Sequence, residues 1–372
     1  MSVSLLSPVE LARALDVRDL ADPAQGAHAM QRIVDDIVAA LTRAWRCEPC
    51  VYRGSRVVTL HDNYDALGYT TDAITRDARY TRYVSETEVL RSHTSALVPG
   101  ALRSLDCAAP DVLLVCPGIV YRRDAIDRLH TGLPHQLDLW RVARDRRLDS
   151  GDLKEMIEIV VRAALPGAEY RVEARVHPYT TEGLQIDVLN GDEWVEIGEC
   201  GVAGVHVLRG AGVQRSGLAM GLGLDRILML RKGIADIRLL RAEDPRIAGQ
   251  MGDLAVSRSV SNRPAITRDL SIAVPVNDAA EELGERVRAA LGERAEAVEA
   301  VEIVSETAGA DLPAVARERI GLQPGQKNVL VRVVLRHPSR TLTRDEANDL
   351  RDDVYDALHQ GTVGMRSMRA PG

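Results

Sequence analysis

The stretch RSGLAMGLGLDRILMLRKGIADIRLL, residues 215–240, is the most informative part of the sequence for the fold. Gly217, Gly221 and Gly223 fall on alternate positions of a strand pattern, so one face of the strand lacks side chains and leaves room for a flat ligand. Arg226 then begins an amphipathic helix, where its charge and the helix N-terminus attract the same anion. Close packing of two backbones is the alternative explanation for the glycines. The spacing matches neither a Walker loop nor a dinucleotide-binding fingerprint.

A second polar stretch, PGIVYRRDAIDRLHTGLPHQLDL at residues 117–139, follows an apolar strand with Arg122, Arg123 and Asp124. A guanidinium group keeps its charge and presents parallel donors that match phosphate oxygens. We therefore interpret this stretch as a phosphate-binding site. A sheet-edge arginine paired with Asp124 or Asp127 is the alternative.

Length and composition set the broad class of the protein. A chain of 372 residues forms one large domain and one or two smaller ones. Its net charge of -7 argues against a surface coated in basic residues. Five widely spaced cysteines are typical of reduced thiols, and the single CxxC lacks the other ligands of a zinc site. No secretory signal or membrane-spanning run is apparent, so we expect a cytoplasmic protein that does not bind membranes.

The order of patterns predicts an α+β protein with two main domains. A helix over residues 30–45 is followed by short β-rich runs up to residue 240 and a helix over 152–164, which together indicate a mainly antiparallel sheet flanked by helices. A strand at 268–276 and a helix at 279–291 are followed by strands at 297–304 and 328–336, joined by a loop that contains glycine and proline, and by a helix at 344–359. This is the order of a ferredoxin-like βαββαβ unit. The expected divisions are an N-terminal helical segment (1–46), a catalytic core (47–252), a linker (253–264) and a C-terminal domain (265–372).

Together, the two polar stretches resemble motifs 2 and 3 of class II aminoacyl-tRNA synthetases, and most narrowly those of the catalytic subunit of phenylalanyl-tRNA synthetases. The resemblance extends to NYDALGYTTDAITRDARYTRYV (63–84), LRSHTSAL (90–97), HPYTTEGLQIDV (177–188) and EWVEIGECGVAGVHVLRGAG (193–212). The C-terminal part, with RPAITRDLSIAVP (263–275) and SRTLTRDEANDLRDDVYDAL (339–358), is similar to the ferredoxin-fold anticodon-binding domain. This fusion resembles the single-chain organellar form of the family.

The resemblance implies an enzyme that uses ATP and Mg²⁺ to activate phenylalanine, or an aromatic or polar analogue of it, and transfers the acyl group to tRNA. It places Arg122 on the α-phosphate and Arg226 on the γ-phosphate. It also places the following residues in the ATP and metal site: Arg123, Asp124, His130, Gly221, Gly223 and, as the magnesium ligand, Glu196. A structural histidine and a surface glutamate are the alternatives for His130 and Glu196.

For the amino acid, the resemblance implies two groups of residues. Those expected to contact its polar groups are His93, Ser95, Gln136 and Asp138, where Asp138 stands in place of the family's glutamate. Those expected around its side chain are His177 and Tyr179, in place of two phenylalanines, and the small Ala219. These changes predict a more polar pocket that still admits an aromatic ring.

For tRNA, we expect contacts from Lys327, Arg332 and Arg336, which follow one another in a stretch without acidic residues. A strand that carries such charges on one face can follow an RNA backbone. A solvated sheet face is the alternative. The protein is expected to be a monomer or a homodimer.

Two other functions fit the sequence. One is a synthetase paralogue that activates a non-protein amino acid for a biosynthetic or resistance pathway, which the changes at Asp138, His177 and Tyr179 suggest. The other is a non-catalytic tRNA-binding paralogue, which predicts loss of the phosphate ligands, although Arg122, His130 and Arg226 are all in register.

The sequence contains no phenylalanine, although phenylalanine is a common core residue. Several family motifs carry substitutes, such as Tyr64, Pro134, His177 and Tyr179. We hypothesise that the protein must be made correctly when phenylalanine codons are unreliable; drift in a biased genome is the alternative.

Overall fold

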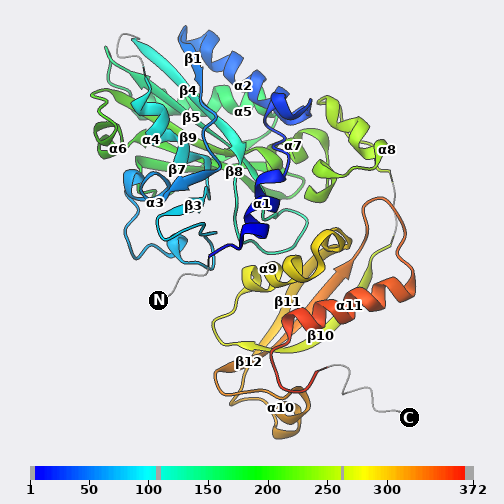
Figure 1. Cartoon of the computed structure of the whole chain (residues 1–372). Coiled ribbons are helices and arrows are strands. Elements are labelled where there is room, and N and C mark those ends of the chain that lie inside the picture. Colours follow the sequence, from blue (N-terminus) through cyan, green and yellow to red (C-terminus); the bar gives the residue numbers. More distant parts are fainter. Residues whose placement is uncertain (1–4, 106–109, 261–263, 365–372) are drawn as a thin grey trace. The chain divides into compact units, whose positions relative to one another are not determined.

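The computed structural model describes residues 5–105, 110–260 and 264–364. The chain divides into two units, which are described separately (Figure 1). The first contains the chain up to Arg122, residues 133–234 and 249–257, and the second contains residues 123–132, 235–248 and 258 onward. Residues 123–132 and 235–248, which we predicted within the catalytic core, therefore belong to the second unit.

A seven-stranded sheet forms the centre of the first unit, in the order β1-β4-β5-β9-β8-β7-β6. β1 and β4 are parallel, and every other pair is antiparallel, as the sequence predicts. The strands are β1 (Glu48–Val51), β4 (Asp111–Ile119), β5 (His135–Ala143), β6 (Tyr170–Ala174), β7 (Thr180–Asn190), β8 (Glu193–Ala203) and β9 (Ser216–Gly223). A separate pair consists of β2 (Val57–Thr59) and β3 (Glu88–Leu90).

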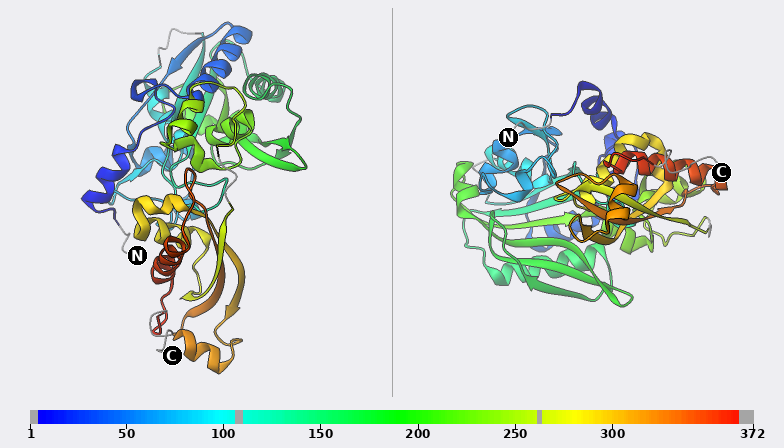
Figure 2. Two further views of the ribbon diagram at one scale, coloured as in Figure 1. Left: turned by 90° about the vertical axis from the view of Figure 1, so that its right-hand side faces the viewer. Right: turned by 90° about the horizontal axis from the view of Figure 1, so that it is seen from below.

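Helices pack on both faces of this sheet (Figures 1 and 2). On one face, α2 (Ala29–Trp45) contacts α5 (Ser150–Ala164) and α7 (Leu224–Lys232). The other face is covered by the 3-10 turn η4 (Thr94–Leu97), α4 (Val98–Arg103) and α6 (Val205–Gly210). The short helix α3 (Leu60–Asn63) lies near η4 and α4. The first helix of the chain is α1 (Pro8–Asp16). The predicted helix at 30–45 forms because Ile33, Ile37 and Leu41 recur at helical spacing and are buried.

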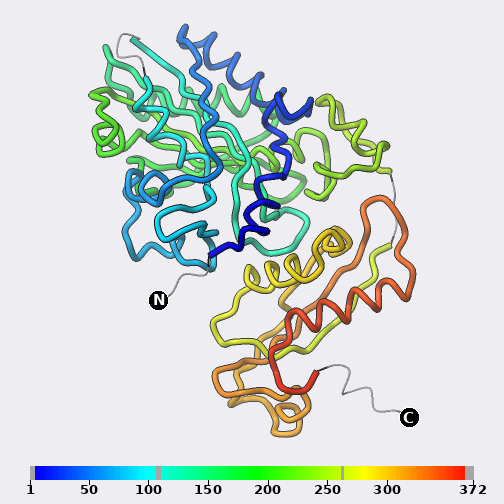
Figure 3. Tube along the Cα trace, viewed as in Figure 1, coloured from blue at the N-terminus to red at the C-terminus, as the bar shows by residue number. Residues whose placement is uncertain are grey.

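The second unit contains the sheet β10-β12-β11, made of β10 (Ile266–Pro275), β12 (Gln326–Leu335) and β11 (Val298–Ala308). Its helices are α8 (Pro245–Ala248), α9 (Ala280–Leu291), α10 (Ala314–Ile320) and α11 (Arg344–Leu358), and Figure 3 follows their order along the chain. α10 lies within a segment that we predicted to be a loop. Among the described residues, the last strand of the βαββαβ order is reduced to one backbone–backbone hydrogen bond to β10, from Gln360 N to Ala273 O (2.8 Å).

Residues 123–132 are packed into the second unit. Ile126 is buried in its hydrophobic core, and the Ile126 carbonyl accepts a hydrogen bond from Val301 N (3.0 Å). Arg288 Nη2 donates to the carbonyl oxygens of Asp124 (2.6 Å) and Ala125 (2.8 Å). The segment is therefore held mainly by its backbone carbonyls.

We predict that Gly284→Ala destabilises the second unit. Alanine is favoured over glycine in a helix by about 1 kcal/mol, but a Cβ at Gly284 of α9 would lie 2.7 Å from the Asp124 carbonyl oxygen. Overpacking of this kind costs about 1–3 kcal/mol, so we expect a lower unfolding midpoint in circular dichroism. Ala289→Gly, at an exposed position of α9, shows how much the unfolding midpoint changes through helix propensity alone. A higher midpoint for Gly284→Ala would show that Asp124 moves aside without cost.

Candidate active site

Two neighbouring strands present the candidate site. Antiparallel pairing of β5 with β9 places Gln136 opposite Gly223, Asp138 opposite Gly221, and Trp140 opposite Ala219. Because side chains alternate along a strand, all of these positions share one face of the sheet. This is the face covered by η4, since Thr94 N donates to Gln136 Oε1 (3.1 Å) and Thr94 Oγ1 donates to Asp138 Oδ2 (2.7 Å).

The glycines of β9 have two different roles. A Cβ on Gly217 would lie 3.1 Å from both Ala203 Cβ and Arg141 O, so this glycine allows close packing. Among the described residues, a Cβ on Gly221 would meet only Asp138 Oδ2, at 3.7 Å, and one on Gly223 only Ile197 O, at 3.8 Å. The sheet surface is therefore open beside Gly221 and Gly223, where the sequence predicts a nucleotide.

Asp138 is buried, and its carboxyl group has a raised pKa. Burial raises the pKa of this carboxyl to about 6, although hydrogen bonds from Thr94, Ser95 and Trp140 and the charge of Arg122 act in the opposite direction. At neutral pH the group is an anion in a largely apolar setting. Such a carboxylate binds an ammonium group strongly, because water competes little for either charge.

Arg122 follows the strand β4 and contributes positive charge to this region. Its Nε donates to the Ser92 carbonyl (2.9 Å), which directs the guanidinium toward His93 and Asp138. Burial and the charge of Arg122 lower the pKa of His93 to about 3, so this imidazole is neutral. A neutral His93 leaves Arg122 as the cation at this end of the site.

Arg226 lies in the first turn of α7 at the other end of the open surface, beside Glu196 of β8. Its Nη1 donates to the Glu196 carbonyl oxygen (3.2 Å). Burial raises the pKa of the Glu196 carboxyl, and the charge of Arg226 only partly offsets this. No cluster of three or more histidine, cysteine, aspartate or glutamate side chains in the described ranges could hold a metal alone.

Aromatic rings fill the end of the site next to Ala219. Tyr179 stacks on His177 (ring centroids 5.7 Å apart) and on Trp140 (6.4 Å), and it lies 6.4 Å from Tyr69. His177 Nε2 contacts Glu199 Oε2 at 2.9 Å. Burial raises the pKa of Glu199, but the hydrogen bond and charge of His177 outweigh it and lower the pKa overall. The rings thus combine an apolar surface with a polar contact, His177–Glu199, at its edge.

Trp140 is a site residue that our sequence reasoning missed. It is fully buried, and its indole Nε1 donates to Asp138 Oδ1 (3.4 Å). The available signal was the period of two along β5, which puts Trp140 on the same face as Gln136 and Asp138. Tyr69, Thr94 and Glu199 were missed as well.

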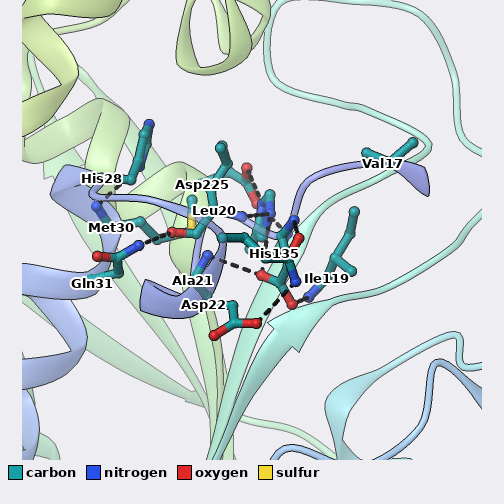
Figure 4. Close-up of polar contacts among 12 residues, drawn as sticks. Val17, Leu20, Ala21, Asp22, His28, Met30, Gln31, Ile119, His135 and Asp225 are labelled. Atoms are coloured by element: carbon teal, nitrogen blue, oxygen red, sulfur yellow. Dashed lines mark hydrogen bonds and ion pairs between the residues drawn. The ribbon is translucent and has the colours of Figure 1, made fainter. Parts of the chain in front are cut away.

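A buried polar network joins the start of β5 to the start of α7, through His135 and Asp225 (Figure 4). His135 Nδ1 and Asp225 Oδ1 are 3.1 Å apart, and the His135 backbone N donates to Asp225 Oδ2. Leu20 N donates to His135 Nε2 (3.1 Å), so Nε2 is the acceptor and Nδ1 faces Asp225 as the donor. Because Asp225 precedes Arg226 directly, this network fixes the start of α7.

The N-terminal segment contributes Asp19 to the same network. Asp19 Oδ2 accepts from Ile119 N (3.0 Å), Asp19 Oδ1 accepts from Ala21 N (2.9 Å), and the guanidinium of Arg91 lies 3.8 Å away. The end of β4 is therefore fixed by the same buried acid.

Three predicted site residues lie in the second unit, namely Arg123, Asp124 and His130. His130 Nδ1 is 2.7 Å from Asp127 Oδ2, and its backbone N donates to Asp127 Oδ1 (2.9 Å). Within the first unit, the structure thus brings the amino-acid residues together with Arg122, Glu196, Gly221, Gly223 and Arg226, whereas the other three are described with the second unit.

The residues predicted to bind tRNA are all paired with acids. Lys327 Nζ lies 2.9 Å from Glu306, Arg332 Nε 2.9 Å from Asp269, and Arg336 Nε 3.0 Å from the buried Glu299. Arg332 and Asp269 are also register partners in β12 and β10. These pairs reduce the positive charge that this face offers to RNA.

Comparison with known proteins identifies the family. A family model described as the tRNA synthetases class II core domain (F) matches residues 16–251, more than half of the chain. This chain belongs to the class II tRNA synthetases. A second model, the ferredoxin-fold anticodon binding domain, matches residues 261–366 of the synthetase. The predicted α+β fold class and the resemblance are confirmed.

The synthetase is similar to curated proteins that are named phenylalanine–tRNA ligases. It is 36% identical over 203 residues to the phenylalanine–tRNA ligase alpha subunit of Prochlorococcus marinus, covering 54% of this chain and 59% of that protein. It is 28% identical over 320 residues to the chloroplastic/mitochondrial phenylalanine–tRNA ligase of Arabidopsis thaliana, covering 82% of this chain and 70% of that protein. The chain thus spans less than two thirds of the alpha subunit. Across the described parts of the chain, no helix combines the length and apolar character needed to cross a membrane.

Proposed function

We propose that the synthetase activates phenylalanine with ATP and transfers the resulting acyl group to tRNA. The observation that carries this proposal is the arrangement on β5 and β9, where a buried carboxylate and an open glycine surface are neighbours. Asp138 is paired with Gly221, and two arginines lie at the edges of this surface. The names of the curated relatives favour phenylalanine over the two alternative functions.

The first step is displacement at the α-phosphorus of ATP. A carboxylate oxygen of the amino acid forms the new bond to phosphorus, and the bond to pyrophosphate breaks. Arg122 stabilises charge on the α-phosphate and Arg226 binds the γ-phosphate, because fixed cations are most effective where negative charge develops. In the second step, a ribose hydroxyl of tRNA attacks the acyl carbon and AMP leaves.

Class II aminoacyl-tRNA synthetases generally use Mg²⁺ with ATP, and the residues here fit that ion. Glu196 offers one half-buried carboxylate beside Arg226, and Mg²⁺ is commonly held by one or two carboxylates together with substrate phosphates. When bound, Mg²⁺ neutralises phosphate charge. We assign Glu196 to it, and we assign Arg123, Asp124 and His130 to ATP.

The amino acid is held at two ends. Asp138 binds the α-ammonium, with Gln136, Ser95 and His93 around its polar groups. Tyr179, His177, Ala219 and Trp140 surround the side chain. The hydroxyl of Tyr179 is already hydrogen-bonded to Ser95, so a substrate ring meets the apolar faces of these side chains.

We propose tRNA as the partner of the ferredoxin-fold domain, with Lys327, Arg332 and Arg336 in contact. We also propose the cytoplasm as the location, and a monomer or a homodimer as the assembly.

Amino-acid-dependent exchange of pyrophosphate into ATP tests the proposed function. We expect phenylalanine to give the highest kcat/KM in a panel of the twenty amino acids and ring-substituted analogues, and charging of phenylalanine tRNA to follow. Best exchange with a non-protein amino acid would favour the biosynthetic paralogue. The absence of exchange in a folded preparation that binds tRNA would favour the non-catalytic one.

A further inference from the structure

An arginine-lined basin lies on the first unit, away from the candidate active site. Its volume is about 630 Å³, and it is formed by residues 144–147 after β5, α6, and residues 213–216 before β9. Among the described residues that line it are one acid, Asp145, and five arginines: Arg144, Arg146, Arg147, Arg209 and Arg215. This is a local excess of positive charge in a chain whose net charge is -7.

The backbone beneath these arginines is fixed. Arg144 N donates to Pro110 O (2.8 Å) and Leu148 N donates to Ser216 Oγ (2.8 Å), which hold both ends of the segment 144–148. On the opposite wall, Val213 N donates to Leu208 O (2.8 Å). A ligand therefore has to order only the side chains, which lowers the entropic cost of binding.

Several of the charges are available. The side chains of Arg147 and Arg209 are exposed and have no hydrogen bond or ion pair within the described residues. Arg144 pairs with its neighbour Asp145 at 3.1 Å, where the two side chains are 46% and 67% exposed. Exposed pairs of this kind contribute little to stability, so the Arg144–Asp145 pair opposes the binding of an anion only weakly.

The lining favours anionic ligands, and in particular those with several phosphates. Guanidinium groups match phosphate oxygens in a bidentate manner, and several in one basin favour a ligand with repeated phosphates. The lining includes no tyrosine or tryptophan, so it offers no ring on which a base can stack. Contacts of this type position a nucleic-acid backbone without selecting its sequence.

The basin is also separated from the amino-acid site along β5. Gln136 lies in the site and Ala143 lies next to the basin, a rise of about 23 Å for seven strand residues. We propose that the arginine basin binds the phosphate backbone of tRNA, at a position distinct from the paired cations of the second unit. The proposal rests on the proposed function, because that function supplies the polymeric phosphate ligand.

Salt-dependent binding of a phenylalanine tRNA transcript to the full chain tests this. We compare Arg147→Ala/Arg209→Ala with Arg43→Ala/Arg162→Ala, a control pair that removes the same charge from exposed helix positions. Each lost phosphate contact reduces the slope of log K against log salt by about 0.7–0.9. For the basin pair we expect a slope reduced by about 1.5 and an affinity on the order of fifty-fold lower at 0.1 M salt. The control pair should keep the wild-type slope, and both pairs should keep the wild-type rate of pyrophosphate exchange.

The outcomes separate this proposal from the proposed activity. Equal slopes for the basin pair and the control pair would overturn the basin proposal. So would a basin pair that loses binding to phosphatidylserine vesicles while its binding to the transcript is unchanged. Either result leaves the proposed activity standing. A reduced slope in a chain that gives no exchange with any amino acid would support the basin and contradict the activity.

Discussion

Asp138→Asn is expected to lower kcat/KM for the amino acid in pyrophosphate exchange by about 10²- to 10³-fold, because removing one partner of a buried ion pair costs about 3–5 kcal/mol. Asparagine keeps the shape of the side chain and can still accept a hydrogen bond from Thr94 Oγ1. What it removes is the negative charge that holds the substrate ammonium. The KM for ATP should change little, because the phosphates are assigned to other residues.

The same group predicts a pH dependence. The pKa of Asp138 is raised to about 6 by burial, so the ammonium-binding anion is present above pH 6 and is lost by protonation below it. In the free enzyme, kcat/KM for the amino acid should therefore fall about tenfold per pH unit below pH 6. This decline should be absent in Asp138→Asn and present in Asp138→Glu. A decline of equal steepness in Asp138→Asn would assign it to another group.

Asp225→Ala is expected to destabilise the first unit by about 4 kcal/mol, because it leaves two buried donors without an acceptor and each such donor costs about 1–3 kcal/mol. These donors are the backbone N–H and the Nδ1–H of His135, which is fully buried. Loss of their acceptor also frees the start of α7, so exchange should fall together with stability.

Tryptophan fluorescence in urea measures this effect on the first unit, which contains all three tryptophans, Trp45, Trp140 and Trp194. Arg226→Ala is the matched control, because it removes the neighbouring cation and leaves the buried network intact. It should lose exchange without a shift in the urea midpoint. An unchanged midpoint in Asp225→Ala would mean that another acceptor replaces the carboxylate.

Much of the fold could be predicted because it depends on local periodicity. Apolar positions at helical spacing define α2, and α11 begins at the predicted residue, where Thr343 and Glu346 form a capping box. The alternation of side chains also predicted the glycine face of β9. Periodicity alone could not show that Gly217 is packed while Gly221 and Gly223 are open, since that depends on which atoms of other segments lie above them.

The features that the sequence did not predict depend on hydrogen bonds and ion pairs between residues that are far apart in the sequence. His135 and Asp225 are 90 residues apart, and Asp19 lies 100 residues from its partner Ile119. Asp269 and Glu299, which neutralise Arg332 and Arg336, lie on other segments of the second unit. A basic stretch without acids in sequence can therefore be largely neutral in space.

The His135–Asp225 network suggests how this enzyme could change over evolution. The network fixes the end of the site that we assign to phosphate through bonds internal to the protein, whereas the end that we assign to the amino acid is bounded by stacked rings from β5 and from the residues just before β7. Substitutions among those rings can therefore alter which amino acid is accepted while the ATP chemistry is inherited unchanged. His177 and Tyr179, two of the positions where this chain departs from the family pattern, lie in that half.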